Sequence, residues 1–246
     1  MSKLAGKKAL VTGGSRGIGA AIAQRLAEDG ADVVITYVSN PAAAATVTAA
    51  IQALGCKAHA IQADAADPDR LEAAVNEAAC ILGGLDILVN NAGIYHTKPL
   101  DEFSTAEFDH SVAVNIRAAF VATRTAVAHM KSGGRVISIG SGLADRIPFP
   151  GNAVYAMTKA AIATLMQGLA RELGPSGITL NTVHPGSIDT DMNPADGAYA
   201  NMQRAVSAVG HYGKASDIAA AVAYLASPEA GFVTGTRLTV DGGFTV

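Results

Sequence analysis

Short apolar runs alternate with longer alanine-rich stretches along most of the chain. Seven runs are rich in β-branched residues, and their apolar positions are continuous, as in strands buried on both faces of a parallel sheet. We expect strands at 8–13, 32–38, 57–64, 85–91, 134–141, 177–186 and 237–243. The apolar spacing between them predicts helices at 17–29, 42–54, 68–82, 105–130, 152–173 and 216–226.

The regular alternation of strands and helices determines the predicted fold. Strand–helix–strand units of this kind form the crossovers of a parallel sheet with helices on both faces. We therefore predict an α/β protein with a doubly wound sheet of about seven parallel strands. No linker divides the chain, so we expect one domain over 1–246. Ligands of such sheets bind at the carboxyl ends of the strands, where the strand order reverses.

One segment, 187–213, interrupts this alternation between the sixth strand and the last helix. It contains Asn193-Pro194 and Asp196-Gly197, which are pairs typical of turns. Long segments at a ligand-bearing edge are often lids. We predict a substrate lid, with a surface helix that has no role as the alternative.

Composition narrows the function classes. Of the 246 residues, 50% are hydrophobic, the net charge is −3 and no basic block is present, so nothing points to nucleic acid. No apolar run approaches the ~20 residues that cross a bilayer, and the N-terminus lacks the apolar core of a signal peptide. Cys56 and Cys80 form no C-x-x-C pair, and the six histidines lack ligand spacing. We expect a cytoplasmic protein without a metal, a disulfide or a membrane partner.

A glycine-rich turn follows the first predicted strand. In "TGGSRGIG", Gly13, Gly17 and Gly19 lie where the strand must turn sharply into a helix. Glycine lets the backbone approach a ligand closely, and the free N–H groups at a helix N-terminus suit a pyrophosphate. The spacing differs from the commoner G-x-G-x-x-G fingerprint, so the turn alone also fits an ordinary tight loop.

Small polar or glycine motifs end four further strands. Asp64 ends the third strand, "NNAG" (90–93) the fourth, Ser141 the fifth and "HPGSIDT" (184–190) the sixth. These residues fit either a ligand edge or plain turns. The helix after the fifth strand carries Tyr155 and Lys159, which are four residues apart and so share a helix face.

Taken in order, these motifs resemble the short-chain dehydrogenase/reductase family. The shared motifs are T-G-x-x-x-G-I-G, N-N-A-G, a mid-helix Asn, Ser, Y-x-x-x-K and P-G-x-I-x-T, and the similarity extends from Lys8 to the ending "VTGTRLTVDGG" (233–243). Six motifs in order are specific, although each is weak alone. The resemblance implies a Rossmann-type fold, a nicotinamide-dependent oxidoreductase, and a homotetramer built on the two long helices.

The resemblance also implies a role for each matching position. The catalytic tetrad would be Asn115, Ser141, Tyr155 and Lys159. The implied cofactor-binding residues are Gly13, Ser15, Arg16, Gly17, Ile18, Gly19, Tyr37, Ser39, Asp64, Ala65, Asn91, Ala92, Gly93, Pro185, Gly186, Ile188 and Thr190, with Tyr155 and Lys159. Ser141 lies one residue further from Tyr155 than is usual in the family, which the loop 146–151 would absorb. Ser138 is the competing assignment.

Tyr155 and Lys159 suit the reduction of a ketone, which needs a hydride at carbon and a proton at oxygen. Tyr155 would donate the proton while Ser141 polarises the carbonyl. A free phenol has a pKa near 10, and we expect the ammonium of Lys159 to hold the pKa of Tyr155 below that value. Lys159 would also bind the nicotinamide ribose, and Asn115 would hold a water that relays protons.

The end of the second strand indicates which cofactor is used. NAD enzymes of this fold place an acid there to accept hydrogen bonds from the adenosine 2′-hydroxyl. Here that position is Tyr37, so the barrier to a 2′-phosphate is absent, and Arg16 is close enough to pair with it. Ser39 and Asn40 add neutral donors. We predict that NADP(H) is preferred over NAD(H).

The substrate is expected to be a small or medium, mostly apolar ketone that is reduced to a secondary alcohol. The residues expected to line its pocket are Tyr95, Leu143, Phe149 and Met192, with Ile147 and Met202. Carrier-protein reductases tend to have a basic residue where this chain has Ser176, which favours a free ketone. A 3-oxoacyl carrier-protein reductase, an NAD-dependent alcohol, polyol or steroid dehydrogenase, and a cofactor-binding sensor without turnover stay open as alternatives.

Overall fold

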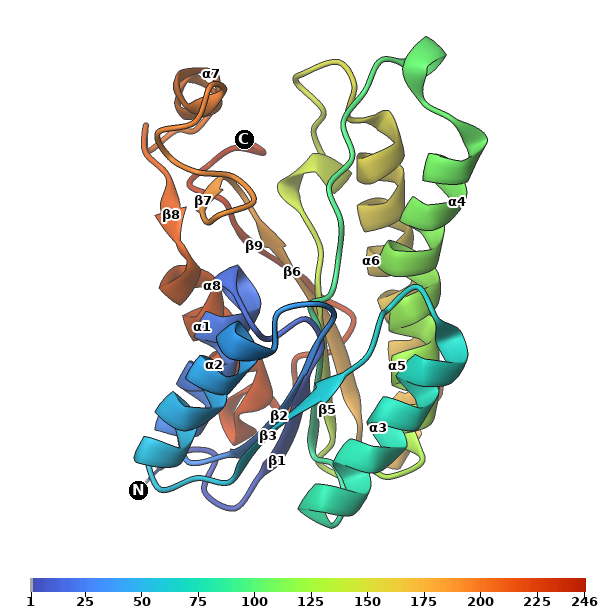
Figure 1. Cartoon of the computed structure of the whole chain (residues 1–246), viewed down its shortest axis with the longest axis vertical. Coiled ribbons are helices and arrows are strands. Elements are labelled where there is room, and N and C mark those ends of the chain that lie inside the picture. Colours follow the sequence, from blue (N-terminus) through green and yellow to red (C-terminus); the bar gives the residue numbers. More distant parts are fainter. Residues whose placement is uncertain (1) are drawn as a thin grey trace.

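A seven-stranded parallel sheet forms the centre of the computed structural model, which describes residues 2–246 (Figure 1). The strands are β1 (Lys8–Val11), β2 (Asp32–Tyr37), β3 (Ala58–Gln62), β4 (Ile87–Asn90), β5 (Arg135–Ile139), β6 (Thr179–Pro185) and β9 (Arg237–Val240). Their order is β3-β2-β1-β4-β5-β6-β9, and every neighbouring pair is parallel. The order reverses between β1 and β4. The predicted doubly wound fold is confirmed, and all seven predicted strands are present.

Helices cover both faces of this sheet (Figure 1). One face carries α1 (Gly17–Glu28), α2 (Pro41–Ala53) and α8 (Ala215–Ala226). The other carries α3 (Pro68–Leu82), α4 (Thr105–Val112), α5 (Ala118–Val127) and α6 (Ala153–Leu173). Both α2 and α3 begin with proline after a capping residue: Asn40 accepts a hydrogen bond from Ala43 N, and Asp67 accepts from Asp69 N and Arg70 N. Such caps satisfy the free N–H groups of the first turn.

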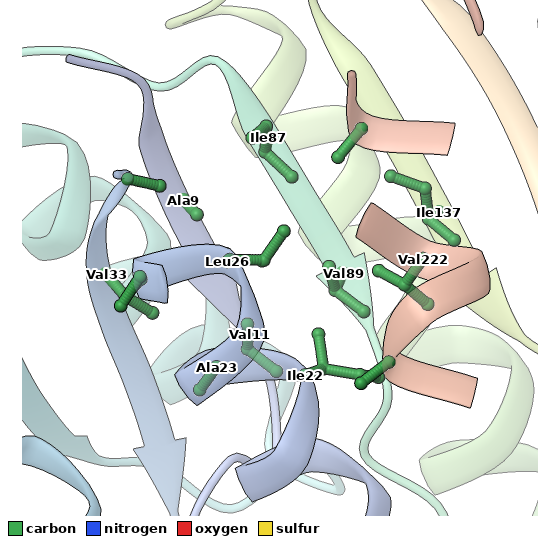
Figure 2. Packing of buried hydrophobic residues seen from close by; sticks show 14 of the residues in the cluster. Ala9, Val11, Ile22, Ala23, Leu26, Val33, Ile87, Val89, Ile137 and Val222 are labelled. Carbon is green, nitrogen blue, oxygen red and sulfur yellow. The ribbon is translucent and has the colours of Figure 1, made fainter. Parts of the chain in front are cut away.

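The apolar core forms two layers, one on each side of the sheet. On the α1 and α8 side, Ile22, Leu26 and Val222 pack against Val11 and Val89 of the central strands (Figure 2). The neighbouring strand position, Leu10, belongs to the opposite layer. Successive side chains of a strand point to opposite faces, so burial of both faces explains the continuous apolar runs in the sequence.

The helix predicted at 105–130 is present as a continuous helical segment from Thr105 to Val127, with one irregularity that the sequence did not predict. A capping box of Ser104 and Glu107 starts α4, and a π-helical turn (Ala113–Arg117) separates α4 from α5. Asn115 lies in this turn. Its amide exchanges two hydrogen bonds with the backbone of Ile94, which compensates for the poorer geometry of a wide turn. Apolar periodicity alone does not reveal such a turn.

The 187–213 segment lies beyond the carboxyl ends of the strands. It contains β7 (Ile188–Asp189) and α7 (Ala200–Ala205), and β7 pairs in parallel with β8 (Gly213–Lys214). The short helix α7 projects past the main sheet (Figure 1). Four 3₁₀ turns complete the structure, at Leu100–Glu102, Gly142–Ala144, Gly174–Ser176 and Pro228–Ala230. Within residues 2–246, we find no helix with the length and apolar character to cross a membrane.

Candidate active site

A cleft of about 660 Å³ runs along the carboxyl ends of the strands. The predicted residues that line it are Gly13, Ser15, Arg16, Gly17, Ile18, Gly19, Tyr37, Ser39, Asp64, Asn91, Ala92, Gly93, Ser141, Tyr155, Lys159, Pro185, Gly186, Ile188 and Thr190. Of the predicted substrate residues, Tyr95, Leu143, Phe149 and Met192 also line it. The fold therefore brings motifs from distant parts of the chain into one continuous site.

Four residues singled out from the sequence lie outside the lining. Ala65 is buried in the apolar layer beneath α3, and Asn115 lies behind the wall of the cleft. Ile147 and Met202 are exposed at the surface of their segments. Neither side chain lines the cleft, because apolar character in an irregular segment does not determine which way a side chain points.

The glycine turn after β1 packs tightly against the NNAG segment. Asn91 Nδ2 donates to the carbonyl oxygens of Thr12 and Gly13, at 2.9 and 3.0 Å. A Cβ atom on Gly19 would lie 2.4 Å from both Asn91 Nδ2 and the Gly13 oxygen. Only glycine fits there, and Asn91 holds the turn from below. The N-terminus of α1, from Gly17 onward, consequently opens on the cleft and can receive a pyrophosphate.

The end of β2 and the glycine turn together form one end of the cleft. Tyr37, Ser39 and Arg16 all line it there. Arg16 also forms an ion pair that the sequence did not predict, with Asp191 of the 187–213 segment. Both side chains are more than half exposed. The 2′-phosphate position expected beside Arg16 therefore has a carboxylate next to it.

Tyr155 and Lys159 lie on the first two turns of α6 and reach the cleft together. Lys159 is only 5% exposed; its Nζ donates to the carbonyl oxygen of Ile139 at 2.9 Å and lies 5.6 Å from the centroid of the Tyr155 ring. A Cβ atom on Gly93 would lie 3.3 Å from that Nζ. The four-residue spacing thus brings the two side chains to one site, as expected.

The protonation of this pair differs from the sequence expectation. Burial raises the pKa of Tyr155 to about 12, while a hydrogen bond with Ser141 acts in the opposite direction. Burial also lowers the pKa of Lys159 to about 8. The expectation that Lys159 holds the pKa of Tyr155 below 10 is wrong, because the loss of water around the phenol outweighs a charge at this distance. At neutral pH the phenol is protonated and the lysine carries its charge.

The structure distinguishes the two candidate serines. Ser141 directly follows β5 and lines the cleft, and its Oγ accepts a hydrogen bond from Leu143 N at 3.1 Å. Ser138 is fully buried inside β5, where it accepts from Asn90 Nδ2 at 3.2 Å. Ser141 is thus the serine that a bound substrate can reach.

Asn115 connects the NNAG loop to the helix that carries Tyr155. Its Oδ1 accepts from Ile94 N at 2.9 Å, and its Nδ2 donates to Ile94 O and to Thr158 Oγ1, at 3.0 and 3.1 Å. Thr158 Oγ1 in turn donates to the carbonyl oxygen of Tyr155 at 2.7 Å. The amide of Asn115 is thus committed to protein partners, whereas the sequence predicted that it holds a water.

Several lining residues were missed by the sequence reasoning. Tyr95 was predicted, but not its partner Asn152, whose Oδ1 accepts from the Tyr95 hydroxyl at 2.6 Å. The Tyr95 ring packs edge-on against Tyr155, with centroids 4.7 Å apart. The residues missed entirely include His110, Val114, Asn152, Asp191, Asn193, Gln203 and Phe244. Phe244 comes from the C-terminal tail, for which no local motif exists.

A buried histidine supports the turn that carries Ser141. His184 Nδ1 lies 2.9 Å from Asp145 Oδ2, and Arg237 Nη1 donates to Asp145 Oδ1 at 3.3 Å. Burial lowers the pKa of His184, so it is neutral at neutral pH. Among the described residues, no group of three or more His, Cys, Asp or Glu side chains is arranged to hold a metal ion.

Comparisons with known proteins agree with this site. The family model described as enoyl-(acyl carrier protein) reductase, a short-chain dehydrogenase/reductase model, matches residues 13–245. A short-chain dehydrogenase from Burkholderia cenocepacia, solved in complex with NADP, is 56% identical with a TM-score of 0.98, over 99% of this chain and 100% of that one.

Two curated relatives have different described roles. The cyclic-di-GMP-binding biofilm dispersal mediator protein of Escherichia coli is 43% identical over 99% of both chains. The 3-oxoacyl-(acyl-carrier-protein) reductase FabG of Staphylococcus aureus is 39% identical over 96% of this chain and 97% of its own length. The fold, the glycine turn and the tyrosine–lysine pair are thus accompanied by similarity over nearly the whole chain, and the protein belongs to the short-chain dehydrogenase/reductase family of oxidoreductases.

Proposed function

We propose that this protein is an NADPH-dependent reductase that converts a small or medium, mostly apolar ketone into a secondary alcohol. The observation that carries the proposal is the shared cleft: Ser141 and Tyr155 face the same space as the glycine turn at the N-terminus of α1. Leu143, Phe149 and Met192 add apolar surface beside them. A proton donor, a dinucleotide turn and an apolar surface are what ketone reduction requires.

The residues of the cleft fit NADP(H). The glycine turn opens the N-terminus of α1 on the cleft, where a pyrophosphate can bind, and no acid occupies the end of β2, where Tyr37 lies. Arg16 supplies a cation near that end, and a solved relative holds NADP. When bound, NADPH supplies the hydride.

The protein's own residues then supply the proton that the carbonyl oxygen needs. The hydroxyl of Tyr155 donates its proton to the carbonyl oxygen as negative charge grows there, and Ser141 Oγ–H donates a second hydrogen bond to the same oxygen. Tyr155 carries that proton at neutral pH, because burial raises its pKa to about 12. Transfer is favourable, since an alkoxide is a stronger base than a phenolate. The charge of Lys159 stabilises the phenolate that remains. We assign Asn115 to positioning of α6, because its amide already bonds to Ile94 and Thr158.

At neutral pH Tyr155 is in the protonated form that the reduction uses. The end of β2, where Tyr37 lies, has no acid to accept hydrogen bonds from an adenosine 2′-hydroxyl, and this argues against the NAD-dependent alcohol, polyol or steroid dehydrogenase. A cofactor-binding sensor without turnover would have no need for Ser141, Tyr155 and Lys159 together. The 3-oxoacyl carrier-protein reductase stays a second candidate because of the Staphylococcus aureus relative.

We further propose a cytoplasmic homotetramer in which the 187–213 segment closes over the substrate. Phe108 on α4, Phe120 on α5 and Met157 on α6 are partly exposed apolar side chains on the helices expected to form the subunit contact. The free thiols of Cys56 and Cys80 are compatible with a reducing compartment. Light scattering of the purified protein tests the tetramer.

A substrate panel tests the proposed reaction. Simple ketones and a 3-oxoacyl thioester would be offered with NADPH and with NADH, and turnover followed by absorbance of the reduced nicotinamide. We expect ketone turnover, with kcat/KM at least ~10-fold higher for NADPH, or about 1.4 kcal/mol. The double variant Tyr37→Asp/Arg16→Ala should reverse that preference. Turnover of the thioester alone would favour the carrier-protein reductase, and a wild-type preference for NADH would overturn the proposal.

A further inference from the structure

An ion pair crosses the cofactor end of the cleft. Arg16 lies in the glycine turn as the residue that precedes α1, and Asp191 lies at the start of the 187–213 segment; the two side chains are bonded to each other. A Cβ atom on Gly17 would lie 3.6 Å from Asp191 Oδ1, so the carboxylate rests over the first residue of the helix. A helix N-terminus and a guanidinium both attract anions. In this structure Asp191 supplies that anion from within the protein.

We propose that Asp191 is a cofactor-specificity residue whose carboxylate competes with the 2′-phosphate of NADP(H) for Arg16. The inference rests on the proposed pairing of Arg16 with that phosphate. A phosphate presents more charge and more acceptor oxygens to a guanidinium than a carboxylate does, so it displaces Asp191. NADH has a hydroxyl at this position and leaves the ion pair intact. Asp191 therefore weakens the binding of cofactors that carry a 2′-phosphate without affecting NADH.

The displacement does not require the segment to unfold. Other contacts hold its local shape: Asp189 Oδ1 accepts from Ala195 N at 2.9 Å, and the amides of Asn193 and Gln203 bond to each other at 2.9 and 3.0 Å. None of these uses the Asp191 carboxylate. Replacement of that carboxylate by an amide therefore removes a charge from an exposed position and leaves the fold of the segment in place.

The effect should be small and selective. An exposed ion pair contributes little, so Asp191→Asn should tighten NADPH binding about two- to fivefold. The same gain is expected for adenosine 2′,5′-bisphosphate, which carries the 2′-phosphate but no nicotinamide. NADH binding should stay unchanged. In the presence of Arg16→Ala, Asp191→Asn should have no further effect, because the guanidinium for which the carboxylate and the 2′-phosphate compete is no longer there.

The experiment measures dissociation constants of NADPH, NADH and adenosine 2′,5′-bisphosphate by calorimetry at low salt. The proteins are wild type, Asp191→Asn, Arg16→Ala and the double variant. Asp196→Asn is the matched control, since it removes the same charge from an exposed position in the same segment, outside the cleft lining. The control should bind all three ligands as the wild type does.

Each other outcome is decisive. Equal tightening of NADPH and NADH by Asp191→Asn would mean general repulsion of the pyrophosphate and would overturn the inference. Weaker NADPH binding would mean that Asp191 orients Arg16 toward the phosphate, which also overturns it. If Arg16→Ala weakens NADPH binding but Asp191→Asn changes nothing, the inference alone fails. If Arg16→Ala leaves NADPH binding unchanged, the proposed role of Arg16 fails as well.

Discussion

The two walls of the cleft are built differently. The wall formed by β4, β5 and α6, with the π-helical turn behind it, holds Asn115 and Lys159 at 2% and 5% exposure, and each side chain donates to a backbone carbonyl group. The opposite wall, the 187–213 segment, leaves Met192 and Tyr199 at 47% and 67% exposure. Regions with few buried apolar contacts open at low free energy, whereas core-packed elements do not. From this difference we expect proton transfer to depend on the packed wall, and selection of the substrate to depend on the open one.

The largest effect on the packed wall is expected from removing the proposed proton donor, Tyr155. Tyr155→Phe deletes only the hydroxyl that donates the proton, so we expect kcat to fall by at least ~10³-fold with nearly unchanged NADPH affinity. Steady-state kinetics and NADPH fluorescence titration measure the two quantities. Substantial residual turnover would refute the assignment of Tyr155 as the acid.

The next largest effect on kcat is expected from Ser141, and Ser138 of the neighbouring strand β5 provides the contrast. Ser141→Ala removes a donor that faces the cleft, and we expect a loss of ~10²-fold in kcat, as for other donors to a developing oxyanion. Ser138→Ala alters a buried strand position and should change kcat by much less, with a lower melting temperature as its main effect. If the two serines exchanged these effects, the assignment of Ser141 would be wrong.

The pH dependence tests the protonation of the packed wall. With its pKa lowered to about 8, Lys159 is charged below that pH and neutral above it, while Tyr155 stays protonated up to about 12. For the reduction, kcat/KM for NADPH should thus be flat below pH 8 and fall roughly tenfold per pH unit above it. A profile that stays flat to pH ~10, near the ordinary pKa of lysine, would contradict the lowered value.

The open wall should give the smallest effects. Gln203→Ala breaks the amide pair with Asn193, and we expect KM for the ketone to rise about two- to fivefold, the magnitude of one or two hydrogen bonds, at an unchanged melting temperature. Asn115→Ala, behind the packed wall, should instead lower the melting temperature, because it leaves partly buried backbone groups of Ile94 without their side-chain partners. Equal changes in melting temperature for Gln203→Ala and Asn115→Ala would contradict the proposed difference in packing between the two walls.

The same contrast explains what could be predicted from the sequence. Gly19, Tyr155 and Lys159 were assignable because close packing and local spacing restrict the residue types there. The π-helical turn around Asn115 left no trace in apolar periodicity. Asp191 and Phe244 reach the cleft through tertiary contacts that no local pattern encodes. The raised pKa of Tyr155 likewise depends on burial, which spacing does not report.

The lining of the cleft extends along the chain from Gly13 to Phe244, and this has a consequence for the lifetime of the protein. No partly folded form presents the whole binding surface, so the cofactor binds the native state and not the unfolded chain. At a free concentration of one hundred times Kd, NADPH would stabilise the native state by about 2.7 kcal/mol. Proteolysis through the unfolded form would slow to a similar extent. The nicotinamide pool of the cell would therefore influence how much of this protein survives, as well as how fast it works.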